Sequence, residues 1–324
     1  MRRARRWAIC LVFATAVVLP DLAAAQSTPA SVPRIGLLAW ADCEFPLFFR
    51  GLEELGYHLG KTIIFECRTA GRHDDGLAPA ASELVQLGVD VIVTESQPAG
   101  RAAHEVTKTI PIVTGISGDP VAGGLAKSIA KPAGNVTGVS YYNTELIAKR
   151  LEFLKEALPS ITSVDVLANP IVSYLPFEND TKLAAAKLGL QLRIHSVDVA
   201  SDLPTAFSTM KDDQAQAVFV LPDLMLAHEA QQIATLALEQ RLPTMAWGGW
   251  FTEAGCLMSY SAPYQQIQHR LATYVDRILK GAAPGELPIE QPTTFELSVN
   301  LRTAKALGLE VPETILLLAD EVIE

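Results

Sequence analysis

Short apolar runs alternate with longer amphipathic stretches along the first half of the chain. The runs are rich in Val, Ile and Thr, which favours strands, and the stretches between them repeat apolar residues at helical spacing. The strands that this pattern predicts are 34–39, 62–66, 89–94, 112–114 and 136–140. Because strands that alternate with helices form parallel sheets covered on both faces, this half is expected to be an α/β unit.

The second half repeats the same scheme. Its expected strands are 163–167, 191–195, 217–221, 244–247 and 257–260. The punctuation repeats too, since a helix ends at Gly56 before the second strand of one half and at Gly189 before the second strand of the other, where glycine supplies a left-handed cap. The fold class that we predict is therefore α/β, with two doubly wound parallel-sheet lobes joined by a hinge.

The boundaries of the lobes follow from the connecting segments. A helix over 145–157 is expected to open the second lobe, which places the hinge near 141–143. A long helix over 265–279 precedes a Pro- and Gly-rich linker and a further strand at 294–299. We expect residues 33–142 with about 263–285 to form the first lobe, and 143–262 with about 286–324 to form the second.

The amino terminus has the pattern of a secretory signal peptide. Four arginines precede an apolar run from Trp7 to Leu19, and small residues lead to an expected cleavage after Ala25. The run is short for a membrane span, which needs about 20 residues, although a retained anchor is the alternative. Residues 1–25 are therefore expected to be removed, leaving a periplasmic protein.

Charge excludes one class of partner. Removing residues 1–25 takes away four Arg and one Asp, so 22 basic residues face 35 acidic ones and the net charge moves from −10 to −13. Nucleic acid binding needs a basic face, which this chain lacks. At about 300 residues with 49 % hydrophobic content, the mature chain can form two cores, and we expect a monomer.

Three cysteines remain after cleavage, namely Cys43, Cys67 and Cys256. In an oxidising compartment, one pair and one remaining thiol is the natural arrangement. Cys43 follows the first expected strand and Cys67 ends the second, so a Cys43–Cys67 disulfide is our hypothesis. The cysteines and histidines lack the spacing of a metal site, and neither a metal nor a cofactor is expected.

Ligands of open parallel sheets bind beyond the carboxyl ends of the strands. The residues expected there offer hydroxyl and N–H donors, carboxylates and aromatic faces, which together suit a zwitterion with an apolar body. The candidate ligand-binding residues are Trp40, Glu95, Ser96, Gln97, Ser117, Gly118, Asp119, Tyr142, Asn169, Asp223, Trp247 and Trp250.

Each candidate also has an ordinary structural explanation. Asp119, Asn169 and Asp223 adjoin prolines, where Asp and Asn commonly stabilise turns. Trp247 falls on an expected strand and would equally suit a core. The grouping of these residues at one edge of the sheets favours a ligand site.

Catalytic motifs are missing from the sequence. It contains no G-x-S-x-G, no H-E-x-x-H and no P-loop lysine motif. The cluster His73-Asp74-Asp75 opens a helix, where Asp is usually a cap. His104, His228 and His269 fall on expected helices, where they are most simply surface or core residues. We expect no enzyme, although a catalyst on a flavodoxin-like scaffold is an alternative.

From about Pro33 to Glu324 the chain resembles the ABC transporter substrate-binding family that includes tryptophan- and tyrosine-type receptors. The stretches that carry the resemblance are 33–38, 118–121, 132–140 (Pro-Ala-Gly-Asn-Val-Thr-Gly-Val-Ser), 149–152, 291–297, 300–309 and 319–323. The resemblance implies a type I periplasmic-binding fold, with ligand loops at Trp40, 95–97, 117–119, Asn169 and Asp223.

The resemblance also implies a function. The chain is expected to be the receptor of an ABC importer, which encloses a small amino-acid-like solute, aromatic or not, between its lobes and delivers it to an inner-membrane permease. The alternative is a ligand-sensing module for a membrane sensor, without transport. Glu95 and Trp40 depart from the family's pattern, which has small residues after the third strand and Asn or Ser after the first; Glu95 is expected either to pair with a cationic solute or to block the site.

Overall fold

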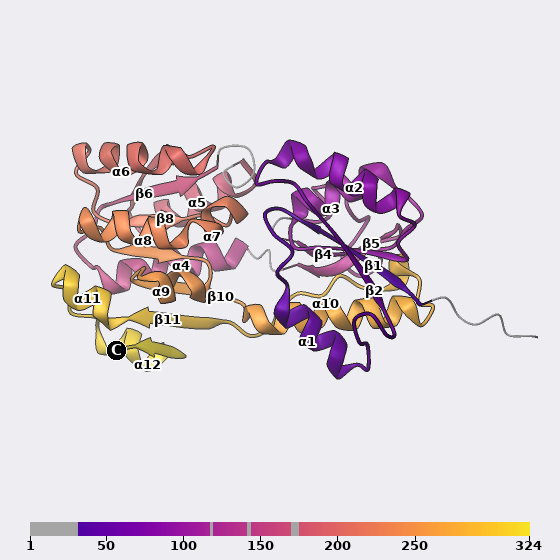
Figure 1. Ribbon diagram of the computed structural model, residues 1–324. Coiled ribbons are helices and arrows are strands. Elements are labelled where there is room, and N and C mark those ends of the chain that lie inside the picture. The colour runs from indigo at the N-terminus through magenta and orange to yellow at the C-terminus, as the bar shows by residue number, and fades with distance from the viewer. Residues whose placement is uncertain (1–31, 117–118, 141–143, 170–174) are drawn as a thin grey trace, which may run out of the picture. The chain divides into compact units, whose positions relative to one another are not determined.

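The structure is a computed structural model that describes residues 32–116, 119–140, 144–169 and 175–324, and Val32–Glu324 form one compact unit. Two sheets organise this unit (Figure 1). We call the five-stranded sheet and its helices the first lobe, and the seven-stranded sheet and its helices the second lobe. The expected signal peptide lies outside the described residues.

The first lobe is a wholly parallel α/β unit with the strand order β2-β1-β3-β4-β5. Its elements are β1 (Arg34–Ala39), α1 (Pro46–Glu54), β2 (Ile64–Thr69), the short 3-10 helix η1 (Asp74–Gly76), α2 (Leu77–Gln86), β3 (Val91–Thr94), α3 (Gln97–Val106), β4 (Ile112–Ile116), β5 (Val136–Ser140) and, from much later in the chain, α10 (Tyr264–Leu279). The expected strand 62–66 is displaced, because Leu59 and Ile63 form a local bridge before β2 begins.

Helices cover both faces of the first sheet. On one face Ile35 and Leu37 pack with residues of α1 and α10, including Leu52 and Tyr274. On the other face Leu38 and Ile92 pack with α2 and α3. The alternation of side chains along each strand thus feeds two separate cores, as a doubly wound sheet requires.

The second lobe has the strand order β12-β11-β10-β9-β8-β6-β7. Its elements are α4 (Thr144–Ala157), β6 (Ser163–Ala168), α5 (Leu175–Lys187), β7 (Gln191–Ser196), η3 (Ala200–Asp202), α6 (Leu203–Asp212), β8 (Val218–Val220), α7 (Leu224–His228), α8 (Ala230–Glu239), β9 (Thr244–Ala246), α9 (Gly249–Ala254), β10 (Met258–Ser261), β11 (Glu296–Asn300), α11 (Leu301–Leu307), α12 (Glu313–Leu318) and β12 (Glu321–Ile323). Strand β11 runs antiparallel to β10, so this sheet is mixed where we expected a parallel one.

Both faces of the second sheet are buried as well. Helices α4 and α5 cover one face, where Leu151 and Leu154 meet Val166 and Phe219. Helices α6, α8 and α9 cover the other, where Phe207, Ile233 and Phe251 pack against the sheet. The carboxyl ends of β6, β8 and β9 are directed toward the first lobe (Figure 1).

The chain passes between the lobes at several points. One passage joins β5 to α4, and the hinge expected at 141–143 lies outside the described residues. Another joins β10 to α10, and a third follows η4 (Pro284–Glu286) and leads to β11. Glu290 still bridges to Val139 of β5, so the chain follows the first sheet up to that residue.

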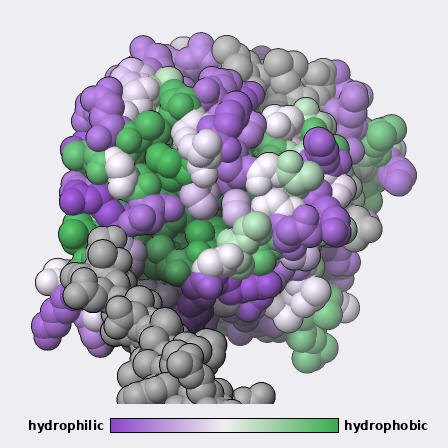
Figure 2. Space-filling model, turned by 90° about the vertical axis from the view of Figure 1, so that its right-hand side faces the viewer, coloured by the Kyte–Doolittle hydropathy of each residue, from purple (hydrophilic) through white to green (hydrophobic). Residues whose placement is uncertain are grey.

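The first lobe ends in an edge strand, β2, whose residues are mostly half-buried. Figure 2, which views the molecule from the right-hand side of Figure 1, shows hydrophobic surface bordered by hydrophilic residues on that side.

Among the described residues, no helix is long and apolar enough to cross a membrane.

Candidate functional site

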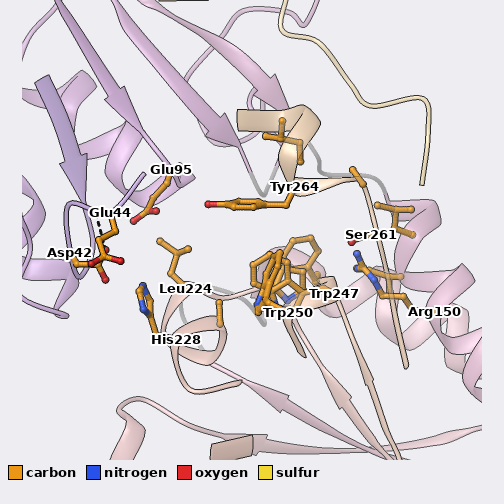
Figure 3. Close-up of a pocket in the computed structure, with 17 residues that line it drawn as sticks. Asp42, Glu44, Glu95, Arg150, Leu224, His228, Trp247, Trp250, Ser261 and Tyr264 are labelled. Carbon is orange, nitrogen blue, oxygen red and sulfur yellow. Dashed lines mark hydrogen bonds between the residues drawn. The ribbon is translucent and has the colours of Figure 1, made fainter. Parts of the chain in front are cut away.

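A cavity of about 310 Å³ lies where residues of the two lobes face one another. This volume is at the lower end of the range of small-molecule pockets. The residues that Figure 3 labels around it are Asp42, Glu44, Glu95, Arg150, Leu224, His228, Trp247, Trp250, Ser261 and Tyr264. We call this space the main cavity.

Two tryptophans form one wall of the main cavity. Trp247 follows β9, and Trp250 lies in the first turn of α9. Their rings meet edge to face, with centroids 4.9 Å apart. Gly248 makes the arrangement possible, because a Cβ there would lie 2.3 Å from the Trp250 ring. Both indole Nε1 atoms are buried without an acceptor among the described residues, so their donors remain available to a bound molecule or water.

Arg150 is a buried cation that borders the same cavity. It projects from α4, only 5 % of its surface is exposed, and its Nε donates to the carbonyl oxygen of Tyr260 at 2.7 Å. Burial lowers the pKa of Arg150 to about 9, which still leaves the guanidinium charged at neutral pH. No carboxylate is paired with it in the part of the chain that the structure describes. A buried guanidinium without an anion is an expected partner for a ligand carboxylate.

Three carboxylates of the first lobe border the cavity on another side. Asp42 and Glu44 follow β1, where Asp42 Oδ1 accepts from the Glu44 backbone N–H at 3.1 Å (Figure 3). Glu95 follows β3 and accepts from the Trp40 backbone N–H at 3.2 Å. Burial raises the pKa of Glu95, and the neighbouring charge of Asp42 acts in the same direction. A nearby cation would act in the opposite direction, because it stabilises the charged form of a carboxylate.

His228 and Tyr264 complete the lining. His228 ends α7, and burial lowers the pKa of its imidazole, which favours the neutral form. Tyr264 begins α10, and burial first, then Glu95, raise the pKa of its hydroxyl. Both side chains are therefore uncharged at neutral pH and add polar atoms to an otherwise aromatic wall.

The loop that carries Asp42 and Glu44 is tied to the sheet. Cys43 lies between them and forms a disulfide with Cys67 of β2, with Cα atoms 6.1 Å apart, which is the pairing that the sequence suggested. Cys256 is a free, buried thiol. The disulfide restricts the loop of the two carboxylates.

Four of the candidate residues line a smaller neighbouring pocket of about 150 Å³ instead of the main cavity. These are Trp40, Ser96, Asn169 and Asp223. Ser96 and Asp223 cap α3 and α7, since each accepts a backbone N–H of its helix at 3.3 and 3.0 Å, respectively. Burial raises the pKa of Asp223 to about 6, and Asp74 of the first lobe also raises it. The structural role that we weighed for Asp223 is thus present.

Two candidates lie away from both pockets. Asp119 is exposed and stabilises a turn, where its Oδ1 accepts from the N–H groups of Val121 and Ala122 at 2.7 and 3.1 Å. Gln97 Nε2 donates to the Asp119 carbonyl at 3.4 Å. Ser117, Gly118 and Tyr142 lie outside the described residues.

Contacts between the lobes surround the pockets. The Trp40 ring packs against His228 with centroids 5.4 Å apart, and Trp40 Nε1 donates to Asp74 Oδ1 at 3.0 Å. Arg72 Nη1 lies 3.5 Å from Glu229 Oε1. Asp74 therefore serves as a partner of Trp40 and not as the helix cap expected from its position.

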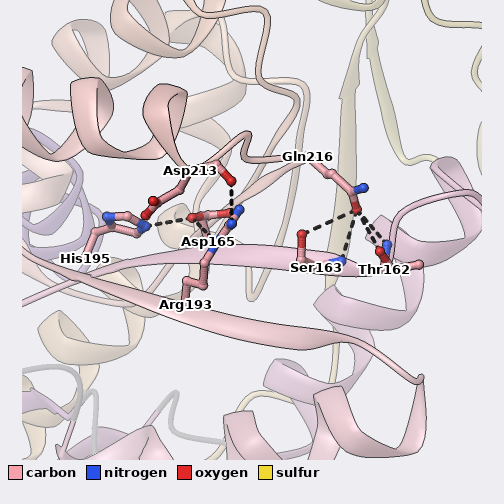
Figure 4. A network of polar contacts seen from close by, with 7 residues as sticks. All are labelled: Thr162, Ser163, Asp165, Arg193, His195, Asp213 and Gln216. Carbon is pink, nitrogen blue, oxygen red and sulfur yellow. Dashed lines mark hydrogen bonds and ion pairs between the residues drawn. The ribbon is translucent and has the colours of Figure 1, made fainter.

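A second polar network lies within the second lobe. The buried Asp165 of β6 accepts from Arg193 at 3.0 and 2.7 Å and bonds to His195 at 2.7 Å (Figure 4). Arg193 also donates to the Asp213 carbonyl. The network joins β6, β7 and the end of α6, and its members line neither pocket. Across the described residues, no group of three or more His, Cys, Asp or Glu could hold a metal ion.

The sequence did not single out three residues of the main cavity, Arg150, His228 and Tyr264. All three lie on helices at apolar-periodic positions, and we assigned the histidine to a surface or a core. The isolated arginine within the buried face of the 145–157 helix was a signal that could have identified Arg150.

Comparisons with known proteins give one consistent result. Residues 47–323 match the model of a family described as ABC transporter substrate binding protein. A tyrosine-binding protein of Clostridioides difficile is 26 % identical over 264 residues, which cover 81 % of this chain and 76 % of that protein.

Solved structures agree with the fold. A conserved domain protein from Vibrio cholerae is 27 % identical with a TM-score of 0.82, and the alignment covers 90 % of this chain and 99 % of that one. A domain from Streptococcus pneumonia in complex with L-Trp is 24 % identical with a TM-score of 0.83, and the alignment covers 90 % and 100 % of the two chains. At that identity the second likeness concerns the fold alone.

Proposed function

Because the chain belongs to the ABC transporter substrate-binding protein family, we propose that it is the receptor of an ABC importer and binds a small amino-acid-like solute between its lobes. Its fold is the type I periplasmic-binding fold that the sequence predicted. We further propose that residues 1–25 are cleaved and that the mature protein acts in the periplasm as a monomer, delivering its solute to an inner-membrane permease.

The observation that carries the proposal is the buried charge of Arg150 beside the main cavity. A guanidinium loses much hydration on burial, and the single carbonyl of Tyr260 replaces only part of it. The carboxylate of an amino acid would supply the missing charge through two parallel N–H···O bonds. Arg150 is thus the proposed anchor of the solute's carboxylate.

The aromatic wall supports a solute with an apolar or aromatic body. Trp247 and Trp250 offer ring surface and two indole donors next to Arg150. The relative from Clostridioides difficile is a tyrosine-binding protein, which is consistent with such a wall. Aromatic stacking contributes about 0.5 to 1.5 kcal/mol beyond the burial of area.

Closure of the lobes would enclose the solute. The main cavity receives residues from both lobes, and the pairs Trp40–His228 and Arg72–Glu229 join the lobes beside it. A solute that contacts both lobes favours the closed form, because only that form makes both sets of contacts.

The test is a binding screen on mature protein, Gln26–Glu324, that has been unfolded and refolded to remove carried-over solute. An amino acid at 100 times its Kd should stabilise the protein by about 2.7 kcal/mol, which thermal shift detects. Any hit is then titrated calorimetrically against Arg150→Gln and Arg150→Lys, with the exposed Arg101→Gln as the control. We expect binding to be lost in the first, weakened in the second and retained in the control, since lysine keeps the charge without the planar fork.

Two outcomes would contradict the proposal. One is the absence of a hit among amino acids and related zwitterions. The other is an unchanged affinity in Arg150→Gln, which would move the carboxylate site elsewhere. Periplasmic release of the tagged full-length chain by osmotic shock tests the proposed compartment separately.

A further inference from the structure

The main cavity is electrically polarised. Arg150 lies at one end of it, in the second lobe, whereas Asp42, Glu44 and Glu95 lie at the other, in the first lobe (Figure 3). Trp247, Trp250, Leu224 and Tyr264 lie between these ends. Apart from Arg150, none of the described lining residues is a lysine or arginine.

The acidic end combines two exposed carboxylates, Asp42 and Glu44, with one that is partly desolvated. Glu95 is half-buried, and its desolvation raises its pKa, as does the charge of Asp42. His228 lines the same end, and burial lowers the pKa of its imidazole, so it supplies no compensating charge at neutral pH. A cationic group would compensate these carboxylates.

The basic end and the wall give independent evidence of a ligand. Arg150 is 95 % buried, and only the Tyr260 carbonyl accepts from it among the described residues. Trp247 is 92 % buried, lines the cavity, and its Nε1 has no acceptor there either. Buried donors without acceptors are costly, which indicates that a bound molecule or water satisfies them.

Building on the proposed function, we propose that the solute carries its carboxylate and its cationic nitrogen at opposite ends of a flat or apolar body. The carboxylate lies against Arg150, the body lies along Trp247 and Trp250, and the cation lies among Asp42, Glu44 and Glu95. An amino acid with a neutral side chain has both charges on one carbon and can satisfy only one end. A side chain that ends in an ammonium or guanidinium group satisfies both.

Two matched pairs of amino acids test this arrangement by calorimetry on ligand-stripped mature protein. L-arginine and L-citrulline share length and shape but differ in charge, and 4-(aminomethyl)-L-phenylalanine adds a distal ammonium to L-phenylalanine. We expect the cationic member of at least one pair to bind about tenfold tighter than its neutral counterpart, which corresponds to one charge-assisted contact.

Variants identify the carboxylate responsible. Glu95→Gln should reduce the preference for the cationic member to less than threefold, whereas Glu105→Gln, an exposed glutamate on α3, should keep it. A melting curve for each variant establishes that it is folded. Salt provides a second readout, because the preference should fall as ionic strength rises.

The outcomes separate this inference from the proposed function. If the neutral members bind as tightly as the cationic ones, the solute still fits the receptor and the separated-charge inference is wrong. A preference that persists in Glu95→Gln would also overturn it. If neither pair binds and no other zwitterion does, the inference falls together with the proposed function.

Discussion

Trp40 and His228 lie ring against ring, with centroids 5.4 Å apart and planes inclined by 30°, although they belong to different lobes. Trp40 directly follows β1 of the first lobe, and 93 % of its surface is buried within a core cluster of the second. The two rings thus form a direct contact between the lobes.

Removing this contact should weaken binding by loosening the closed form. We expect Trp40→Leu and His228→Ala each to reduce solute affinity by about 1 kcal/mol, and the double variant to lose little more than either one. His228→Phe retains a ring and should bind more tightly than His228→Ala. Fully additive losses in the calorimetric cycle would show that the rings act independently.

Substitutions at Trp250 and at Gly248, which leaves room for the Trp250 ring, test whether the tryptophan wall binds the solute. Trp250→Ala should weaken an aromatic or flat solute by about 2 kcal/mol, and Trp250→Phe by less. Gly248→Ala should also weaken binding, because the new Cβ displaces the Trp250 ring. Equal affinities in the four proteins, measured by calorimetry, would exclude Trp250 from the site.

Asp223 should make stability depend on pH. Its pKa is about 6 in the folded protein, against about 3.9 in an unfolded chain. Between these values the folded protein holds the extra proton, so the contribution of Asp223 to the free energy of unfolding falls as pH rises. Asp223→Asn keeps the helix cap but does not titrate. We expect the free energy of unfolding of Asp223→Asn, relative to that of wild type, to grow by about 2 kcal/mol from about pH 4 to about pH 7.

Urea unfolding across that pH range measures the difference. Asp119→Asn, in an exposed turn, is the matched control and should show no such trend. A constant difference between Asp223→Asn and wild type would mean that Asp223 keeps an ordinary pKa.

The Cys43–Cys67 disulfide should stabilise the first lobe. Its cysteines are 24 residues apart, and closing a loop of that size in the unfolded chain is worth about 3 kcal/mol. We expect the Cys43→Ser/Cys67→Ser variant to have a free energy of unfolding in urea that is lower than that of wild type by this amount. Reduced wild type should resemble the variant. Unfolded mature protein should show one thiol before reduction, from Cys256, and three after it. Three thiols before reduction would rule the bond out.

Much of the fold could be predicted because its signals are local. The run Arg34–Ala39 is apolar after its first residue, and Val136–Ser140 follows a Pro-Ala-Gly-Asn loop. Both are strands with the expected bounds. The antiparallel direction of β11 could not be predicted, since periodicity carries no information about strand direction. Strand β12 was missed because Glu321–Ile323 is too short to show a period.

The candidate site could be predicted only in part. The rule of strand ends led to Glu95, Trp247 and Trp250, which line the main cavity. It could not identify Arg150 or His228, because these lie on helices and depend on how the two lobes meet. Asp119 lies away from both pockets, and its Oδ1 accepts from the backbone N–H of Val121 in its own turn.

The position of α10 has a consequence for the order in which the protein is assembled. Leu271, Tyr274 and Val275 of this helix complete the core against Ile35 and Leu37, which are made more than 200 residues earlier. Strands β6 to β10 follow one another without such an interruption. A chain that emerges amino end first would therefore complete the middle of the second sheet while α1 alone covers that face of the first sheet. Until α10 is made, the apolar residues on that face would remain exposed to non-native contacts, which a chaperone would suppress.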